Sequence, residues 1–555
     1  MSQTVASLVV DSLVANGVDA LYCVPGVQND AFFDALYDRK DAVRAVQARH
    51  EQGAAYMALG AALATGKPQA FCVVPGPGFL NSTAALCTAY ALNAPVFGIV
   101  GDNATAFTGK RLGQLHEIDG QLEIAGYLAK HAVRIDDPEL APSRLATAWS
   151  AGLSDRPGPV IAEVPVDLWL KATSYRAEDL KGENLAPPAA ERRVLERVSE
   201  TISASRRPLI IVGGGAQDFS GEIRTLATRI GAGVSAFRTG HGVMPTGDSL
   251  CLENPVAHAV WPECDLVIGL GTRLVQQKNL WGLDDGIRVI HIDIDADVLA
   301  GDREPDLSVH ADLADVLPRL LAILPRQDPR DDWRTRMAVA RDRVDAAIGA
   351  ELRPQLDWLA AIRKAMPGDA IIVDELTQIG YVARFAFPKH CPRSFLSTGY
   401  QGTLGWGIAA AIGAADARRD VAVVSVSGDG GALFTIGELA TAVHHDIPIN
   451  IIVMNDNAYG NVRTIQRENY GGRIIASDLT SPNFVELARS FGFSASRADT
   501  PDELEQHLAS AIARGGRNLI EVLVGDFPSP WKRVMLGHAR GEEDHEWPWP
   551  TPPPD

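Results

Sequence analysis

The residues with the clearest chemistry form two short groups, each following an apolar run. The first group is Gly428-Asp429-Gly430-Gly431, and the second is Asn455-Asp456-Asn457-Ala458-Tyr459. Backbone N–H groups of a glycine-rich turn at a helix start can bind phosphate oxygens. Asp429 and Asp456 could supply hard oxygen ligands to one Mg²⁺. The pattern predicts a metal–diphosphate clamp, and hence a phosphorylated cofactor, although a tight turn whose Asp caps a helix is the simpler alternative.

The elements around these groups must bring the two aspartates together. A valine-rich run over residues 421–426 precedes the first group, a helix-like stretch covers 432–445, and a second apolar run covers 447–454. This order of strand, turn, helix and strand predicts one βαβ unit. Asp429 and Asp456 would then lie at adjacent strand ends.

A third acidic candidate, Glu51, lies in Arg49-His50-Glu51, after a short apolar segment and at the start of a small-residue helix predicted over residues 52–63. An isolated acid at this position is typical of a helix N-terminus, where the dipole favours negative charge. The following segment, residues 71–78, is predicted to be a buried strand that ends in a Gly-Pro turn, and Asn81 comes shortly after it.

Together these motifs resemble the thiamine diphosphate-dependent enzymes, and among them the acetolactate synthase-like group. The resemblance rests on the Gly-Asp-Gly motif with its later Asn pair, and on the order His-Glu-Gln, helix, ATGKP, strand, Gly-Pro-Gly and Asn81. It covers nearly the whole chain, with further matches at Val24-Pro25-Gly26 and at residues 402–407, 481–485 and 528–531.

The resemblance implies thiamine diphosphate and Mg²⁺ as cofactors, with Glu51 as the acid that activates the aminopyrimidine. The metal ligands would be Asp429, Asp456, where the family usually has Asn, and the backbone carbonyl of Ala458. Leu404 would support the cofactor in its bent form, and the Gly402 carbonyl would accept a hydrogen bond from the pyrimidine amino group. The implied cofactor-binding residues are Pro25, Gly26, Glu51, Asn81, Thr377, Gly402, Leu404, Gly428, Asp429, Gly430, Gly431, Asp456, Ala458 and Tyr459.

Three further residues join Glu51 as catalytic candidates. Asn29 follows the Pro25-Gly26 turn, where family members place groups that face the substrate. Gln114 and His116 lie in a loop that aligns with the Phe-Gln-Glu loop of acetolactate synthases. His116 could move a proton near neutral pH, or it could be an ordinary histidine of a surface loop.

The resemblance implies decarboxylation and/or carboligation of a 2-oxo acid. The chain departs from acetolactate synthase in three places: residues 461–466 contain no Trp, Pro75 replaces a small hydroxyl residue, and Leu115-His116 replaces Phe-Gln. These departures favour a catabolic or specialised decarboxylase or carboligase over the branched-chain biosynthetic enzyme. A thiamine-dependent lyase or C–C hydrolase of hydroxyketones or diketones, and a non-catalytic cofactor-binding paralogue, stay open as alternatives.

The alternation of helix and strand predicts an α/β protein with three doubly wound parallel-sheet domains. We expect a pyrimidine-binding domain over 1–170, a middle domain over 188–330, a diphosphate-binding domain over 350–535 and an extended tail over 536–555. The glycine turns at 213–215 and 269–271 of the middle domain are compatible with FAD, with ADP or with no ligand. No GxGxxG with a later acid is present, which argues against an NAD-dependent oxidoreductase.

Bulk properties limit the partners. With 555 residues the chain is too long for one core, and a net charge of −18 argues against nucleic acid and anionic membranes. No apolar stretch approaches a membrane span, and no secretory signal is recognisable. The six cysteines show no CxxC spacing and are expected to be reduced in a cytoplasmic protein. By resemblance, the protein would be a homodimer or homotetramer, with active sites for a small 2-oxo acid at the subunit interface.

Overall fold

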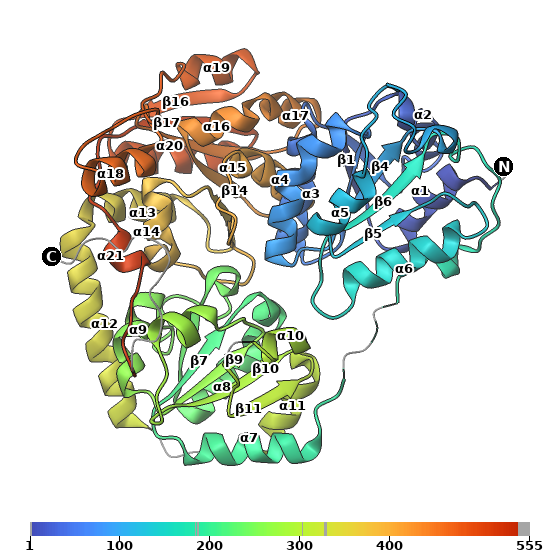
Figure 1. Cartoon of the computed structure of the whole chain (residues 1–555). Helices are drawn as coiled ribbons and strands as arrows, with labels where there is room; N and C mark the ends of the chain where they lie inside the picture. The colour runs from blue at the N-terminus through green and yellow to red at the C-terminus, as the bar shows by residue number, and fades with distance from the viewer. Residues whose placement is uncertain (1–2, 184, 186–187, 302, 327–329, 542–555) are drawn as a thin grey trace.

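The chain folds into three α/β units in the computed structural model, each built on a parallel sheet (Figure 1). The model describes residues 3–183, 185, 188–301, 303–326 and 330–541. In Figure 1 the N-terminal unit lies at the right, the middle unit at the bottom and the C-terminal unit at the upper left. The predicted fold class is confirmed, while the residue limits of the domains stay predictions.

The N-terminal unit has a six-stranded sheet in the order β2-β1-β3-β4-β6-β5. Its strands are β1 (Ala20–Cys23), β2 (Arg44–Gln47), β3 (Gln69–Val73), β4 (Val96–Asp102), β5 (His131–Arg134) and β6 (Val160–Pro165). Its helices are α1 (Val5–Ala15), η1 (Val27–Asn29), α2 (Asp30–Tyr37), α3 (Glu51–Thr65), α4 (Pro77–Leu92), η2 (Thr105–Phe107), α5 (Gln121–Leu128), α6 (Ala141–Leu153) and η3 (Ala177–Leu180). Buried apolar side chains on both faces of the sheet explain its nearly continuous apolar strands.

The middle unit has a five-stranded sheet in the order β11-β10-β9-β7-β8. Its strands are β7 (Pro208–Val212), β8 (Gly233–Ala236), β9 (Leu266–Leu270), β10 (Arg288–Asp293) and β11 (Leu307–His310). Its helices are α7 (Arg192–Ala204), η4 (Gly214–Phe219), α8 (Ser220–Ile230), η5 (Arg238–Gly240), α9 (Asn254–Val260), η6 (Trp261–Glu263), η7 (Gln277–Trp281), α10 (Ala296–Leu299) and α11 (Leu313–Ile323).

The C-terminal unit repeats the strand order of the N-terminal unit, as β13-β12-β14-β15-β17-β16. Its strands are β12 (Ile371–Asp374), β13 (Phe395–Ser397), β14 (Val423–Gly428), β15 (Ile449–Asn455), β16 (Ser494–Ala498) and β17 (Arg517–Leu523). Its helices, with α12 leading into the unit, are α12 (Asp331–Glu351), α13 (Arg353–Ala365), α14 (Gln378–Ala386), α15 (Trp406–Ala417), α16 (Asp429–Thr435), η8 (Ile436–Glu438), α17 (Leu439–His444), α18 (Gly460–Asn469), α19 (Phe484–Ser490), α20 (Pro501–Arg514) and α21 (Trp531–Val534).

The predicted βαβ unit is present, but its helix differs from the prediction. The strands β14 and β15 pair in parallel, with Gly428 opposite Met454, so both acidic groups lie at one sheet edge. The helix begins at Asp429, three residues before the predicted start, because Gly428 caps it in an extended conformation. It is then broken at the 3₁₀ turn η8, where the Glu438 side chain turns to the N-terminal unit.

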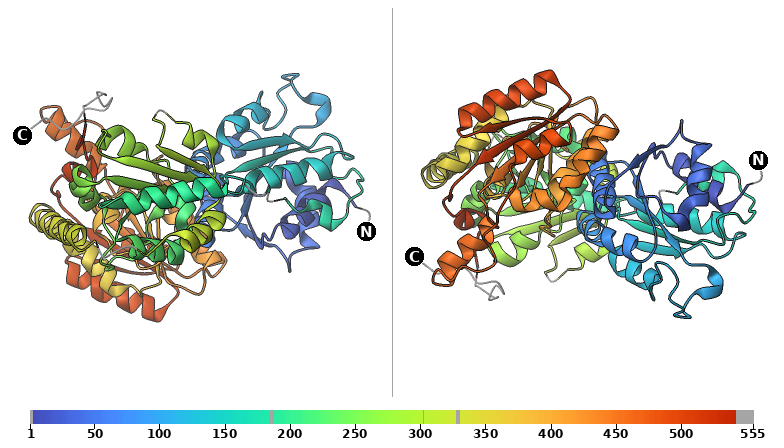
Figure 2. Two further views of the ribbon diagram at one scale, coloured as in Figure 1. Left: turned by 90° about the horizontal axis from the view of Figure 1, so that it is seen from below. Right: turned by 90° about the horizontal axis from the view of Figure 1, so that it is seen from above.

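The N-terminal and C-terminal units pack closely through α3 and α15 (Figure 2). A Cβ atom on Gly60 would lie 2.0 Å from the Ala410 carbonyl oxygen, and one on Gly413 would lie 1.9 Å from the Met57 carbonyl oxygen. The two helices can therefore touch backbone to backbone only because glycine stands at both positions. A buried Asp416, which accepts from Tyr22 and pairs with Arg44, reinforces this contact.

Two segments outside the predicted limits of the middle domain pack on the middle unit. One is α12, most of which lies between the predicted middle and diphosphate-binding domains, where Trp333 is buried and donates to the Pro208 carbonyl at 3.0 Å. Beyond α21, the amides of Ala539 and Arg540 both donate to the Trp281 carbonyl. Residues 542–555 of the predicted tail, and residues 186–187 between the first two predicted domains, lie outside the described residues. Within the described part, no helix combines the length and apolar character needed to cross a bilayer.

Candidate active site

The two aspartates of the predicted clamp face each other at the carboxyl edge of the C-terminal sheet. Asp429 is 1% exposed and accepts a hydrogen bond from the Ser481 hydroxyl at 2.5 Å. Asp456 accepts from the Ala458 amide at 3.1 Å. Burial, and then the negative charge of Asp429, raise the pKa of Asp456 to about 7. Two carboxylates brought this close favour a cation between them.

The donor set fits Mg²⁺. The carboxylates of Asp429 and Asp456 and the carbonyl of Ala458 are hard oxygen ligands. No group of three or more His, Cys, Asp or Glu side chains converges anywhere among the described residues, so ligands from a bound phosphate would have to complete the shell. A Cβ on Gly430 would lie 2.7 Å from the Tyr459 ring, so glycine lets this ring close over the first turn of α16.

A second part of the predicted cofactor site lies before α15. Gly402 has a positive φ of 60°, and Leu404 keeps 37% of its surface exposed. The Tyr56 hydroxyl of α3 donates to Thr403 at 2.8 Å and so ties this turn to the N-terminal unit. Thr377 caps α14, with its hydroxyl oxygen accepting from the Gly380 amide.

Glu51 is the first residue of α3, one residue earlier than the predicted helix start. Its carboxylate accepts a hydrogen bond from the Asn81 amide at 3.0 Å. The backbone in front of it is fixed from the C-terminal unit, because Glu438 accepts from the amides of Arg49 and His50. The structure thus brings Glu51 and Asn81 together, and both are accessible to solvent.

The predicted substrate loops meet at the carboxyl edge of the N-terminal sheet. The His116 ring lies 3.2 Å from the side-chain oxygen of Gln28, whose amide nitrogen donates to the Leu115 carbonyl. Gly26, next to Pro25, lies against the residue that follows β3, since a Cβ there would lie 2.4 Å from the Val74 side chain. Gln114 is half-buried, and its backbone amide donates to Glu117.

Asn29 is fully buried, and its amide donates to the Val73 carbonyl at 2.9 Å. In this position the side chain supports the end of β3. Direct contact between Asn29 and a substrate stays a prediction.

Two buried polar residues, one in the N-terminal unit and one in the C-terminal unit, escaped sequence reasoning. Gln121 begins α5 and bonds to the Gly76 turn, and Glu375 is buried after β12, where burial raises its pKa to about 7. The position of Glu375 at a strand end was a usable signal, because acids at the carboxyl ends of parallel strands often lie near ligands. No local pattern marks Gln121.

A cavity of about 440 Å³ lies where the three units meet. The glycine turns at 213–215 and 271 line it, together with Arg238, Arg273 and Tyr400. The Arg238 and Arg273 guanidinium groups lie 4.2 and 4.9 Å from the centre of the Tyr400 ring. Burial lowers the pKa of Arg238 to about 10. Among the described residues, neither arginine has a carboxylate within 4.0 Å; Arg238 donates to the Gly399 carbonyl at 2.7 Å, and Arg273 lies 3.5 Å from the Ala91 carbonyl.

Comparison with known families agrees with this geometry. The chain matches the thiamine pyrophosphate enzyme models for the N-terminal TPP binding domain over residues 3–124, the central domain over 195–320 and the C-terminal TPP binding domain over 377–522. The chain therefore belongs to the thiamine pyrophosphate enzyme family and is an enzyme of the lyase or transferase type.

Among curated proteins, the chain is similar to a probable 2-ketoarginine decarboxylase of Pseudomonas aeruginosa, at 32% identity over 92% of each chain. It is similar to acetolactate synthase isozyme 1 large subunit of Escherichia coli, at 28% identity over 97% of each chain. A probable acetolactate synthase large subunit of Methanocaldococcus jannaschii is 31% identical, over 94% of this chain and 91% of that one. The predicted acetolactate synthase-like family is confirmed.

Proposed function

We propose that this protein uses thiamine diphosphate and Mg²⁺ to decarboxylate a 2-oxo acid, to join it to a second carbonyl compound, or both. The observation that carries the proposal is the pair of facing carboxylates, Asp429 and Asp456, at the edge shared by β14 and β15. The names of the relatives support it, since they describe a 2-ketoarginine decarboxylase and acetolactate synthases.

In this proposal the chain anchors the cofactor at two ends. Asp429, Asp456 and the Ala458 carbonyl hold Mg²⁺, while Gly428, Gly430 and Gly431 present backbone N–H groups to the diphosphate. The bound cofactor supplies a carbon nucleophile and an electron sink. The exposed Leu404 side chain supports its ring, and the Gly402 carbonyl accepts from its amino group.

Glu51 holds the proton that activates the cofactor, because a carboxyl group in hydrogen-bond reach of a ring nitrogen can exchange a proton with it. Asn81 fixes the orientation of that carboxyl group. Glu51 belongs to the N-terminal unit, whereas Asp429 and Asp456 belong to the C-terminal unit. By resemblance to the family, we propose a homodimer or homotetramer in which Glu51 of one subunit serves the clamp of its partner.

The substrate would bind against the loops around Gln28 and His116. The His116 ring contacts the side-chain oxygen of Gln28, and the His116 backbone has a positive φ of 61°. The contact with Gln28 gives the ring a defined position from which to donate or accept a proton. We assign the choice of substrate to this wall, together with Gln114 and Tyr459.

The test is CO₂ release from a panel of 2-oxo acids, including pyruvate and 2-ketoarginine, with thiamine diphosphate and Mg²⁺ added. We expect release from at least one acid, which disappears when the protein is stripped of Mg²⁺. Absence of release across the panel would instead favour the lyase or C–C hydrolase alternative, for which hydroxyketones and diketones are the substrates to assay. A protein that binds the cofactor but turns over none of these compounds would be a non-catalytic paralogue.

We propose further that the middle unit binds a nucleotide, either FAD or ADP. The half-buried Arg238 and Arg273 support this, because guanidinium groups that have no carboxylate partner favour phosphate. An absorbance spectrum of the purified protein identifies a flavin directly. If no flavin is present, ADP should raise the melting temperature of the wild type more than that of Arg238→Gln, whereas equal shifts would contradict the assignment.

A further inference from the structure

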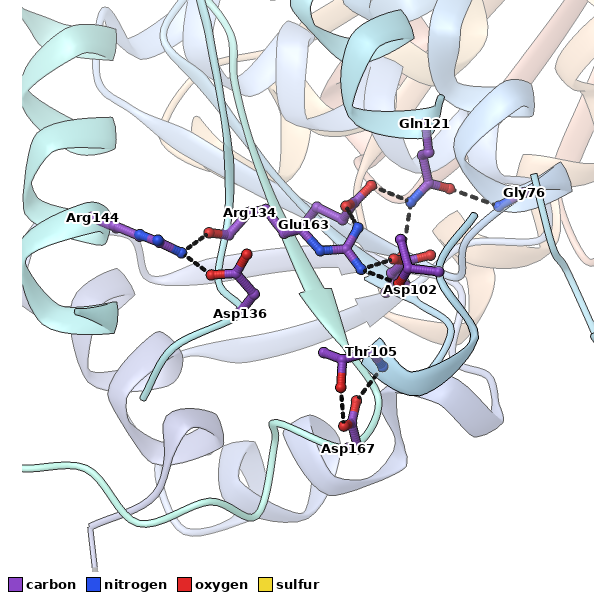
Figure 3. A network of polar contacts seen from close by, with 11 residues as sticks. Gly76, Asp102, Thr105, Gln121, Arg134, Asp136, Arg144, Glu163 and Asp167 are labelled. Carbon is purple, nitrogen blue, oxygen red and sulfur yellow. Dashed lines mark hydrogen bonds and ion pairs between the residues drawn. The ribbon is translucent and has the colours of Figure 1, made fainter. Parts of the chain in front are cut away.

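A buried network of hydrogen bonds links three strands of the N-terminal sheet to the turn before α4 (Figure 3). Gln121, the first residue of α5, lies at its centre and is 4% exposed. Its side-chain oxygen accepts from the Gly76 amide at 2.8 Å. Its side-chain nitrogen donates to the Gly101 carbonyl at 3.0 Å and to the Glu163 carboxylate at 2.8 Å. Both ends of the carboxamide are therefore used, which fixes its orientation.

The charged residues behind Gln121 hold it in place. Glu163 is 1% exposed and pairs with Arg134 at 2.5 Å, and Arg134 pairs in turn with Asp102 at 2.6 Å. Because a buried carboxylate keeps its charge only when it is hydrogen-bonded and paired, Glu163 needs both Arg134 and the Gln121 amide. The network therefore extends from β4, β5 and β6 to Gln121.

The turn that Gln121 holds has an unusual backbone. Gly76 is the N-cap residue of α4, with φ 58° and ψ −113°, and because it is glycine it has no side chain to cap the helix. A Cβ atom on Gly76 would lie 2.4 Å from the His116 carbonyl oxygen, so the turn lies directly against the His116 backbone. Gln121 supplies a fixed acceptor to a turn that has no local cap.

This turn is connected to Glu51. The helix α4 starts immediately after Gly76, and its residue Asn81 donates to the Glu51 carboxylate at 3.0 Å. Gly78 also lies against Glu51, since a Cβ there would be 3.6 Å from a Glu51 oxygen. A shift of the Gly76 turn would therefore move the start of α4, with Asn81, relative to Glu51.

We infer that Gln121 is a positioning residue for Glu51, acting through the Gly76 turn and Asn81. The inference rests on the proposed role of Glu51. Glu163 fixes the Gln121 carboxamide, the carboxamide fixes the turn, and the turn sets where Asn81 holds the Glu51 carboxylate. The same contact fixes the backbone of His116, so one side chain aligns both walls of the site.

The test compares Gln121→Met, which keeps the side-chain volume but removes all three hydrogen bonds, with Thr105→Val as a matched control. Thr105 bonds to Asp167 on the same sheet edge but does not touch Gly76 (Figure 3). The readouts are thiamine diphosphate affinity and the NMR-measured rate of hydrogen–deuterium exchange at C2 of the bound cofactor. We expect Gln121→Met to slow exchange roughly 10- to 100-fold, because a displacement near 1 Å has effects of that order. The thiamine diphosphate affinity of Gln121→Met and the exchange rate of Thr105→Val should change only a few-fold.

A double-mutant cycle with Asn81→Ala separates positioning from general damage. If Gln121 acts through Asn81, the double variant should exchange little more slowly than the worse single variant, because contributions that share one route are not additive. Fully additive effects, or wild-type exchange in Gln121→Met, would overturn the inference.

If Gln121→Met does not fold, Gln121→Glu replaces it in the same cycle. This variant keeps an acceptor for Gly76 but places a second carboxylate against Glu163, and the two repel each other when both are charged. The C2 exchange rate of Gln121→Glu, divided by that of the wild type, should therefore increase when the pH is lowered from 8 to 6. A ratio that does not change with pH would overturn the inference. Since exchange at C2 requires no substrate, a failure to release CO₂ would sink the proposed reaction without deciding this test.

Discussion

At the scale of single residues, the metal ligands give the sharpest expectation. Asp429→Ala removes a ligand, whereas Asp456→Asn keeps an oxygen ligand and removes the repulsion between two facing carboxylates. We expect Asp429→Ala to raise the Mg²⁺ concentration needed for cofactor binding by at least about tenfold, and Asp456→Asn to change it only a few-fold. The measurement is the Mg²⁺ dependence of the thermal shift caused by thiamine diphosphate. If Asp429→Ala showed the same Mg²⁺ dependence as the wild type, the proposed clamp would be ruled out.

Glu163 gives a pH-dependent expectation at the same scale. Burial, and then the charge of Asp102, raise the pKa of Glu163 to about 6 from an ordinary value of 4.5, in spite of Gln121 and Arg134. The folded protein thus binds this proton more tightly than the unfolded chain, and the resulting stabilisation, present below pH 4.5, is lost as the pH rises through 6.

Glu163→Gln lacks this titration. The melting temperature of the wild type relative to that variant should therefore fall between pH 4.5 and pH 6.5, by the equivalent of roughly 1.5 kcal/mol. Melting curves recorded across this range check it, with Thr105→Val as a control that keeps the wild-type profile. If the difference in melting temperature between the wild type and Glu163→Gln stayed constant or grew with pH, the raised pKa of Glu163 would be contradicted.

At the scale of elements, the contact between α3 and α15 depends on two glycines. A Cβ at position 60 would meet backbone of α15 at 2.0 Å, and backbone cannot move away as a side chain can. Gly60→Ala should therefore destabilise the protein by about 1–3 kcal/mol or more, as overpacking does. Gly349→Ala, in a helix position with nothing within 4 Å, should be neutral or slightly stabilising. Thermal melting checks both, and equal effects would show that the helices separate easily.

The same elements show what the sequence could predict. The apolar runs over residues 421–426 and 447–454 predict β14 and β15 to within two residues at each end, because a short apolar run between polar turns is a local signal. The helix predicted over residues 432–445 is wrong in detail, because it is broken at η8. At this break Glu438 bonds to the backbone of Arg49 and His50, almost 400 residues away in sequence, and no local pattern encodes such a contact.

The site divides in the same way. Glu51, Asp429 and Asp456 could be proposed because each stands in a motif at the end of a predicted strand or the start of a predicted helix. Gln121 and Glu163 could not, because their roles come from contacts over 45 and 42 residues that no periodicity encodes. The middle-unit arginines became candidates only when the fold placed both against Tyr400.

At the scale of the whole molecule, the proposal requires two chains in each site. Glu51→Gln and Asp429→Ala should each be inactive. Co-expressed in equal amounts, they should recover about one quarter of wild-type activity, because half of the dimers are mixed and each mixed dimer has one intact site. Each variant paired with itself is the control. No recovery, despite mixed dimers shown by differently tagged chains, would place Glu51 and Asp429 of one site in the same chain.

The central claim is that Glu51 activates a thiamine diphosphate held by the Asp429 clamp. The most direct test is the rate of hydrogen–deuterium exchange at C2 of the bound cofactor in the wild type and in Glu51→Gln. The glutamine keeps the shape and the hydrogen bond to Asn81 but cannot exchange the proton. We predict that both proteins bind the cofactor and that exchange in Glu51→Gln is slower by a factor on the order of 100 or more. Exchange at the wild-type rate in Glu51→Gln would contradict the account.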